Sequence, residues 1–231
     1  MSNSQPAPLA GVRVIESSML GPAGITTHLA DLGADVIKVE PPQGDYIREM
    51  TWPIVEGNSL MHLHLNRGKK SITLDLKNPE AVQIYKDLVA TADVVVEAMR
   101  PGALARRGLG YDDLKEINPK IVFCTISGYG MTGPYESLPS HGIAYDTWAG
   151  IVNPAYDDEG FCYIPEHASV GIHAGPIFGA FSILAGVTRA RETGEGCFME
   201  VGQSDAAAYM DWYRPESHMA YRRPEAVVTG N

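Results

Sequence analysis

Hydrophobic residues in the first forty positions fall into two short runs separated by a helix-spaced segment. Residues 13–17 (RVIES) and 34–40 (ADVIKVE) have the β-rich composition of strands, whereas residues 25–33 (ITTHLADLG) carry apolar side chains at helical spacing. Gly33 stands where this helix should close, because glycine accepts the left-handed conformation that ends many helices. The pattern therefore predicts a strand–helix–strand unit over residues 11–40.

The alternation of strands and helices continues in the middle of the chain. Residues 69–76 (KKSITLDL) alternate like a half-buried strand. The Asn-Pro-Glu of residues 78–80 is typical of a helix start, because Asn caps the first turn, Pro fits its φ angle and Glu faces the positive end of the helix dipole. Residues 93–99 (DVVVEAM) and 120–130 (KIVFCTISGYG) read as two further strands, the first of them buried on both faces.

Beyond Gly150 the pattern becomes polar and then helical. The stretch 156–169 (YDDEGFCYIPEHAS) is polar, and its residues 157–159 are most simply a solvated acidic loop. Residues 175–191 have a long helical pattern, and residues 197–203 predict one more strand. Strands that alternate with helices are typical of parallel sheets. We therefore expect an α/β fold, with a Rossmann-like parallel sheet and helices on both of its faces.

The C-terminal segment has a different character. Ser204 is expected to cap an amphipathic helix over residues 204–222, which has too many large apolar groups for a free surface helix and should need a partner. The chain then stops in a turn-like Thr-Gly-Asn, which favours a chain cut from a longer one. We divide it into a large domain, residues 1–203, and an exit helix with the start of a linker, residues 204–231, with a second domain largely absent.

Composition narrows the class of protein. Of 231 residues, 45% are hydrophobic and 20% are charged, a globular balance. The formal net charge of −10 argues against non-specific binding of nucleic acid. The first residues lack the basic and apolar regions of a signal peptide, and no uninterrupted apolar run reaches about 18 residues, so no membrane span is expected. Cys124, Cys162 and Cys197 form no CxxC pair, which favours reduced thiols in a cytoplasmic protein.

Ligands of parallel α/β sheets bind outside the carboxyl ends of the strands. Of two clusters of basic residues, one stands just before a predicted strand and the other follows a buried strand, where a ligand loop should lie. Residues 64–71 place Arg67, Lys69 and Lys70 beside a glycine, and residues 100–108 place three arginines around a Pro-Gly turn. Each cluster is either a solvated turn or a site for phosphate, whose oxygens suit Arg and Lys donors.

Glycines and histidines supply the other candidate chemistry. Residues 127–134 (SGYGMTGP) end a strand and offer backbone N–H groups for an oxyanion, although a loop that needs positive φ angles explains the same glycines. His141 is either a structural hydrogen-bonding group or a catalyst. His62 and His64 would share one face of an extended segment, and two histidines without a third ligand make no metal site.

Taken together, the segments resemble the family III CoA-transferases, which include formyl-CoA transferase, carnitine CoA-transferase and the α-methylacyl-CoA racemases. The similar stretches are PLAGVRVIE, GPAG, LADLGADVIKVEPPQGD, LNRGKKSITLDLK, ADVVVEAMRPGALARRGLGYDDLKEINPKIVFCTISGYGMTGP and ILAGVTRARETGEG with QSDA. The resemblance implies a large Rossmann-like domain, a smaller second domain, and a homodimer of interlocked ring-shaped chains, or else a complementary chain.

The resemblance also implies that coenzyme A lies across the strand ends. By position, Met19 and Leu20 would line the adenine side, and Ala98 and Met99 would lie along the pantetheine.

Two further positions, Lys69 and Arg106, would meet phosphates of the same CoA. One contact is missing, because Pro41 stands where formyl-CoA transferase has an arginine. The substrates implied are an acyl-CoA and a carboxylic acid, with CoA as the acyl carrier and no metal.

The catalytic residues depart from the family pattern. The resemblance implies an Asp nucleophile near Ile172, and no Asp is there. Glu166, which can form an anhydride as Asp does, and His173, which can only transfer protons, are the nearest substitutes. His141 matches the histidine of the racemases.

Three functions follow from these observations. The first is a CoA-transferase that moves CoA between a thioester and a carboxylic acid. The second is an α-methylacyl-CoA racemase or epimerase, with His141 as the base. The third is a non-catalytic CoA-binding fragment or subunit that requires a partner.

Overall fold

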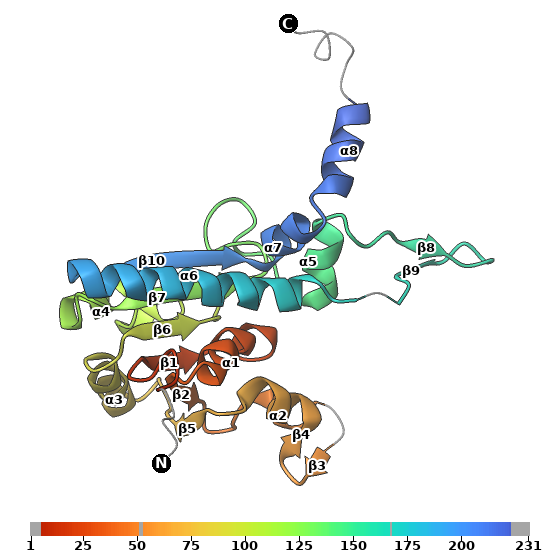
Figure 1. Cartoon of the computed structure of the whole chain (residues 1–231). Helices are drawn as coiled ribbons and strands as arrows, with labels where there is room; N and C mark the ends of the chain where they lie inside the picture. The colour runs from red at the N-terminus through yellow and green to blue at the C-terminus, as the bar shows by residue number, and fades with distance from the viewer. Residues whose placement is uncertain (1–5, 51–52, 167, 223–231) are drawn as a thin grey trace, which may run out of the picture.

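A six-stranded parallel sheet forms the centre of the protein in a computed structural model that describes residues 6–50, 53–166 and 168–222 (Figure 1). The strand order is β10–β7–β6–β1–β2–β5, and every neighbouring pair is parallel. The strands are β1 Arg13–Ser17, β2 Asp35–Glu40, β5 Lys70–Thr73, β6 Val94–Glu97, β7 Val122–Ser127 and β10 Cys197–Gly202.

Helices cover both faces of this sheet, which confirms the predicted fold class. On one face, α1 (Gly24–Asp31) and α6 (Gly171–Thr193) pack over an apolar core that includes Val14 and Ile183. The opposite core contains Ile15 together with residues of α3 (Pro79–Val89) and α4 (Tyr111–Ile117). Because Val14 and Ile15 point to opposite faces, β1 is buried on both sides.

The order of the strands creates a switch point between β1 and β6. From β1 the chain runs outward to β2 and β5, and it then returns to β6 on the other side of β1 before continuing to β7 and β10. Crossover loops leave β1 and β6 in opposite directions, an arrangement that in open α/β sheets places a ligand crevice outside the carboxyl ends of the two strands. The loops after these two strands are therefore where a ligand is expected.

Local sequence signals set several element ends as predicted. The side chain of Asn78 accepts a hydrogen bond from the backbone N–H of Glu80 at the start of α3. Gly33 follows α1 with a φ angle of 97°, in the region that favours glycine. The strand expected at residues 13–17 is β1 without change.

The segment around the paired histidines differs from the prediction. His62 and His64 lie in a helix, α2 (Leu60–Asn66), and not in an extended segment. Ser59 caps this helix by accepting a hydrogen bond from the N–H of His62. A short hairpin of β3 (Pro53–Val55) and β4 (Asn58–Ser59) precedes it.

Glycines bring α6 close to the sheet and to α1. A Cβ atom at Gly179 would lie 2.5 Å from Ile25 Cδ1, and one at Gly186 would lie 2.4 Å from Met199 Cε. The helix is also long and apolar enough to cross a membrane, with a mean hydropathy of 1.4, but half of that window is buried inside the protein. A core helix of a soluble protein meets the same length and composition test, so this is weak evidence for a span.

The sequence predicts one continuous C-terminal helix, but the structure has two helices in this segment. They are α7 (Gln203–Met210) and α8 (Tyr213–Tyr221), and Gly202, not Ser204, precedes the first of them. Figure 1 shows α8 projecting away from the sheet. Tyr213 is 71% exposed and Tyr221 is 91% exposed, so the apolar surface expected here is present.

The polar stretch before α6 also has more structure than predicted. Two short strands, β8 (Ala155–Tyr156) and β9 (Cys162–Tyr163), pair into a hairpin that extends from the body (Figure 1). Asp157 holds the turn, because its carboxylate accepts hydrogen bonds from the N–H groups of Glu159 and Phe161. Between β7 and this hairpin lies α5 (Gly142–Trp148).

Candidate functional site

The loop that leaves β1 has the most constrained backbone at the switch point. Among the described residues, Leu20 is the one residue other than glycine with φ in the left-handed region, at 58° with ψ −142°. Such a conformation costs on the order of 1–3 kcal/mol and is concentrated at functional sites. Met19 beside it is 40% exposed, so the two residues assigned to the adenine side border solvent at the switch point.

A buried group of charges lies directly beneath this loop. The Glu16 carboxylate at the end of β1 contacts Lys38 Nζ at 3.0 Å and Lys69 Nζ at 2.9 Å. Its oxygens also accept hydrogen bonds from the hydroxyls of Ser18 (2.9 Å) and Thr26 (2.6 Å). All three charged side chains are at most 2% exposed.

The ion pairs favour the charged forms of Glu16 and Lys38, which burial alone would disfavour. Burial alone would raise the pKa of Glu16, but Lys69 and Lys38 together hold that pKa below its ordinary value. Burial likewise opposes the charge of Lys38, yet Glu16 and Asp45 raise its pKa. Lys69 is the exception, because burial and the charge of Lys38 outweigh Glu16 and lower its pKa to about 8.

Lys69 is therefore an internal residue in this structure. Its ammonium donates to the carbonyl oxygen of Ala23 at 2.8 Å and contacts the side-chain oxygen of Asn66 at 3.3 Å. Both bonds, and the contact with Glu16, point away from bulk solvent. Lys69 thus fixes the turn Gly21–Ala23 that follows β1.

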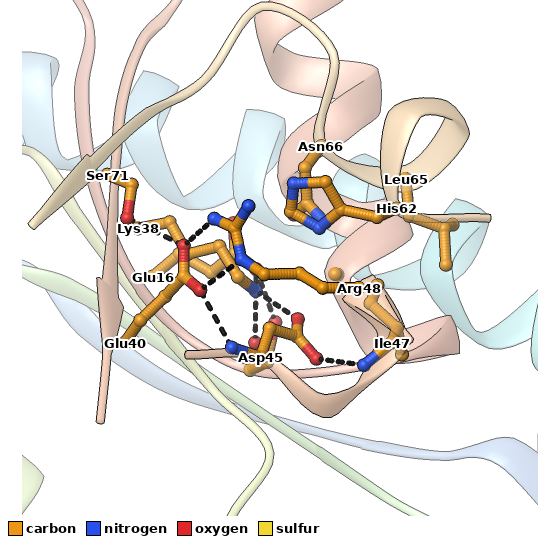
Figure 2. Close-up of polar contacts among 12 residues, drawn as sticks. Glu16, Lys38, Glu40, Asp45, Ile47, Arg48, His62, Leu65, Asn66 and Ser71 are labelled. Carbon is orange, nitrogen blue, oxygen red and sulfur yellow. Dashed lines mark hydrogen bonds and ion pairs between the residues drawn. The ribbon is translucent and has the colours of Figure 1, made fainter. Parts of the chain in front are cut away.

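A second charge cluster closes the end of β2. Figure 2 shows the Glu40 carboxylate between Arg48 and Ser71, with Arg48 Nη2 2.7 Å from Glu40 Oε1. The backbone N–H of Asp45 donates to the same carboxylate at 2.7 Å. Burial opposes ionisation, but the hydrogen bonds from Arg48 and Ser71 prevail and lower the pKa of Glu40 to about 2.

The loop after β6 carries the remaining predicted CoA contacts. The N–H of Ala98 donates to the carbonyl of Ser17 at 3.3 Å, which joins this loop to β1. The N–H of Met99 donates to Glu97, whose pKa is raised by burial although Thr125 also donates to it. Arg106 is exposed, and its guanidinium donates to the carbonyl of Pro101 at 3.2 Å.

The loop after β7 brings His141 toward the strand ends. A Cβ atom at Gly128 would lie 2.0 Å from Ser140 Oγ, so the segment before α5 packs directly on this loop. His141 is the exposed residue immediately before α5. One of the N–H groups predicted to bind an oxyanion is already engaged, because Met131 donates to Glu200 at 2.6 Å.

A carboxylate that the sequence did not point to lies at the start of α6. Asp146 on α5 is fully buried and accepts hydrogen bonds from the N–H groups of Val170 (3.0 Å) and Gly171 (2.7 Å). Gly171 directly precedes Ile172, near which the resemblance implies a nucleophile. Asp146 and Gly171 are 25 residues apart in the sequence, and the fold brings them together.

The other predicted catalytic residues lie on the surface. Glu166, in the segment between β9 and α6, is exposed, and His173 on α6 is also exposed. Ile172 is half-buried against the β1 loop, because a Cβ atom at Gly21 would lie 2.0 Å from Ile172 Cγ1. An apolar side chain therefore occupies the place expected for the nucleophile.

A cavity of about 140 Å³ lies where α1, α2 and α6 meet beside the β1 loop. Its polar lining comes from Thr27, His28, His64, Arg67 and His173, and its apolar lining includes Ile172 and Pro176. Among residues 6–50, 53–166 and 168–222, no cluster of three His, Cys, Asp or Glu side chains is placed to hold a metal ion.

Comparison with known proteins gives one consistent result. The family model described as CoA-transferase family III matches residues 9–231. The chain is 40% identical over 196 residues to succinyl-CoA:glutarate CoA-transferase of Mus musculus, covering 84% of this chain and 44% of that protein. It is 35% identical over 209 residues to the succinyl-CoA–L-malate CoA-transferase beta subunit of Chloroflexus aurantiacus, covering 90% of this chain and 50% of that protein.

Solved structures agree with this result. A crystal structure of Rv3272 from Mycobacterium tuberculosis has a TM-score of 0.84 and 33% identity, covering 95% of this chain and 62% of that one. A CAIB/BAIF family protein from Brucella suis also has a TM-score of 0.84, with 31% identity and coverage of 95% and 59%. The chain spans about half the length of the curated relatives it matches.

Proposed function

Because this chain belongs to CoA-transferase family III, we propose that it binds coenzyme A at the switch point and serves the transfer of CoA from an acyl thioester to a carboxylic acid. The observation that carries the proposal is the pair of loops after β1 and β6, which face one crevice and are joined by the bond from Ala98 to Ser17.

The proposed CoA site uses exposed and half-buried residues of these loops. Met19 and Leu20 border the adenine, Ala98 and Met99 lie along the pantetheine, and the exposed guanidinium of Arg106 donates to a phosphate. Lys69 does not contact the ligand in this arrangement but holds the turn after β1 in position, since its ammonium is bound to Glu16 and to the carbonyl of Ala23 in that turn.

The chemical step needs a carboxylate. A carboxylate oxygen of the protein attacks the thioester carbonyl, the C–S bond breaks, and CoA leaves as a thiolate. The thiolate then attacks the protein's carbonyl in the new anhydride, which releases the donor acid as a carboxylate and leaves the protein as a CoA thioester. The acceptor carboxylate reacts with this thioester by the same two steps in reverse, which releases the new acyl-CoA and frees the protein's carboxylate. Ile172 cannot perform this reaction. Of the acids in this chain, Asp146 is bonded to the residue next to Ile172 but is fully buried, whereas Glu166 is exposed.

The apolar residue at position 172 favours a second candidate, a CoA-binding subunit whose carboxylate comes from a partner. The exposed aromatic side chains of α8 suit contact with a second copy or with a complementary chain. The proposal includes three further expectations. The chain forms such an assembly, it is cytoplasmic, and its large domain ends at residue 203. The names of relatives such as the succinyl-CoA:glutarate transferase are those of CoA-transferases, and they do not favour the racemase alternative.

Calorimetry with CoA tests the binding site. Arg106→Gln should weaken CoA by about tenfold, the value of one charge-assisted hydrogen bond, and the loss should shrink as salt rises. Lys120→Gln, an exposed lysine at the opposite end of β7, is the matched control. Absence of CoA binding by the unaltered chain would refute the proposed site.

Mass spectrometry after incubation with succinyl-CoA tests the chemistry. A covalent adduct mapped to Asp146 or Glu166 supports catalysis by this chain, and its loss in Asp146→Asn or Glu166→Gln identifies the nucleophile. CoA binding without any adduct supports the subunit that depends on a partner.

A further inference from the structure

Glu97 is a buried carboxyl group at the switch point that the proposed CoA site does not use. It is the last residue of β6, it pairs in register with Ser17 of β1, and it is 5% exposed. Its Oε2 accepts a hydrogen bond from the N–H of Met99 at 2.8 Å, and its Oε1 accepts one from the hydroxyl of Thr125 on β7. Glu97 therefore joins the loop after β6 to the neighbouring strand.

Glu97 differs from two other buried carboxyl groups at this edge of the sheet. Glu16 in β1 contacts two lysines, and Glu40 at the end of β2 contacts Arg48. In the part of the chain that the structure describes, no Lys, Arg or His side chain forms an ion pair with Glu97. Hydrogen bonds alone compensate its burial, and burial prevails over them and raises its pKa.

The groups packed around Glu97 do not supply a charge. Tyr85 from α3 and Cys124 from β7 are titratable groups that interact with it. Burial raises the pKa of both, that of Cys124 to about 12, so both are uncharged near neutral pH. The arginines at positions 100, 106 and 107, in the loop that follows Glu97, are exposed. A change in charge near this loop therefore acts on Glu97 without a cation to oppose it.

CoA brings such a change, because its pyrophosphate and ribose phosphate are anionic. In the proposed site, Met99 lies along the pantetheine and Arg106 meets a phosphate, so the ligand covers the loop that Glu97 holds. Like charges repel strongly in a medium of low dielectric, and this favours the uncharged form of the buried carboxyl group. A protonated Glu97 keeps both bonds, because its O–H donates to the Thr125 hydroxyl oxygen while its other oxygen accepts the N–H of Met99.

We propose that Glu97 takes up a proton from solvent when CoA binds, and that in its uncharged form it holds the loop after β6 against β7. The inference rests on the proposed function and adds a positioning residue to the same site. By linkage, a ligand that raises the pKa of Glu97 binds less tightly as the pH rises through that pKa. CoA affinity should therefore be greatest on the acid side.

Calorimetry with CoA in buffers of different ionisation enthalpy measures the proton directly. The unaltered 231-residue chain should take up as much as about one proton per CoA more than Glu97→Gln, whose amide keeps the same bonds and does not titrate. The phosphates of CoA titrate in both samples, so the difference isolates Glu97. Equal proton uptake by the two chains would overturn the inference.

The pH profile of CoA affinity separates a positioning role from a merely structural one. Between about pH 5 and about pH 8 the unaltered chain should lose about tenfold in affinity relative to Glu97→Gln, which corresponds to a coupling of about one pKa unit. Glu97→Ala, which loses both bonds, should bind CoA about tenfold more weakly at every pH. Glu192→Gln, an exposed glutamate in the last turn of α6, is the control and should follow the unaltered chain. Parallel profiles for the unaltered chain and Glu97→Gln would contradict the proposal.

Carbon-13 NMR of the unaltered chain, labelled at the glutamate carboxyl carbons, keeps the test independent of any variant that fails to fold. Near neutral pH, CoA should move one carboxyl signal toward the chemical shift of an uncharged acid. The signals of Glu16 and Glu40 should not move in this way, because their cations keep them ionised. CoA that binds without such a signal overturns only this inference, whereas a chain that binds no CoA refutes the proposed site as well.

Discussion

The two halves of the sheet, on either side of the switch point, differ in the interactions that hold the loops at the carboxyl ends of their strands. In the half formed by β1, β2 and β5, charged side chains such as Glu16, Lys38 and Glu40 are buried and paired (Figure 2). In the half formed by β6, β7 and β10, glycines allow close packing of loops, as where Ser140 lies on Gly128.

The difference indicates how each half positions a ligand. Buried ion pairs hold the loop after β1 in one arrangement, since a displaced charge would lose its partners inside a medium of low dielectric. In the loop after β7, close packing on glycine acts together with hydrogen bonds such as the one from Met131 to Glu200. A substitution should therefore be much more costly in the first half when it removes a charge, and in the second half when it adds an atom.

The largest effect is expected for Lys38→Met. The substitution removes the cation that Glu16 and Asp45 share. Glu16 keeps its contact with Lys69, but Asp45 loses its ion pair with Lys38, and an uncompensated buried charge costs about 3–5 kcal/mol. Urea unfolding should show a loss of this size in the free energy of unfolding. Lys115→Met, which removes an exposed ion pair with Asp112, is the control and should leave that free energy nearly unchanged. Similar values for both variants would mean that burial of the first pair is unimportant.

The second-largest effect is the loss of folding stability at low pH. The pKa of Glu40 is about 2 in the folded protein and 4.5 in its ordinary state, so its contribution to stability is present above about pH 4.5 and is lost as the pH falls toward 2. A lowering of this size corresponds to roughly 3 kcal/mol. Urea unfolding between pH 5 and pH 3 should show a steeper loss for the unaltered chain than for Glu40→Gln. Parallel pH profiles would contradict the role given to Arg48 and Ser71.

The smallest effect tests the glycine half. Gly128→Ala introduces a Cβ atom 2.0 Å from Ser140 Oγ, and overpacking of this kind costs about 1–3 kcal/mol. Thermal unfolding should show a lower Tm, and Ser140→Gly in the same chain should recover most of it. A double variant as unstable as Gly128→Ala alone would show that the clash lies elsewhere.

Short-range signals in the sequence predicted much of the fold. The cap at Asn78 and the closing Gly33 act within one or two turns, so the residues that determine them are neighbours in the chain. The strands and the helices on both faces followed from the same local periodicity. The Ser59 cap was a signal of the same kind, and it would have identified the helix that contains His62 and His64.

Long-range pairing limited the prediction of the site. Lys38 stands in a strand whose alternation is compatible with solvent, and only its contact with Glu16, twenty-two residues earlier, explains its burial. Lys69 was assigned to phosphate because its own segment is basic, whereas the fold turns its ammonium inward. Asp146 reaches the start of α6 across 25 residues, which no local pattern reveals.

The pairing of β7 with β10 has a consequence for synthesis of the chain. The register joins Ser127 to Gly202, so β7 leaves the ribosome about 75 residues before its partner. At about 5–20 residues per second, this interval lasts roughly 4–15 seconds. During that time the apolar segment VFCTIS presents one unpaired row of backbone groups, which is a template for pairing with another chain. Nascent chains that meet on a polysome are thus expected to aggregate first through β7, and a chaperone that binds this strand would protect them until β10 has emerged.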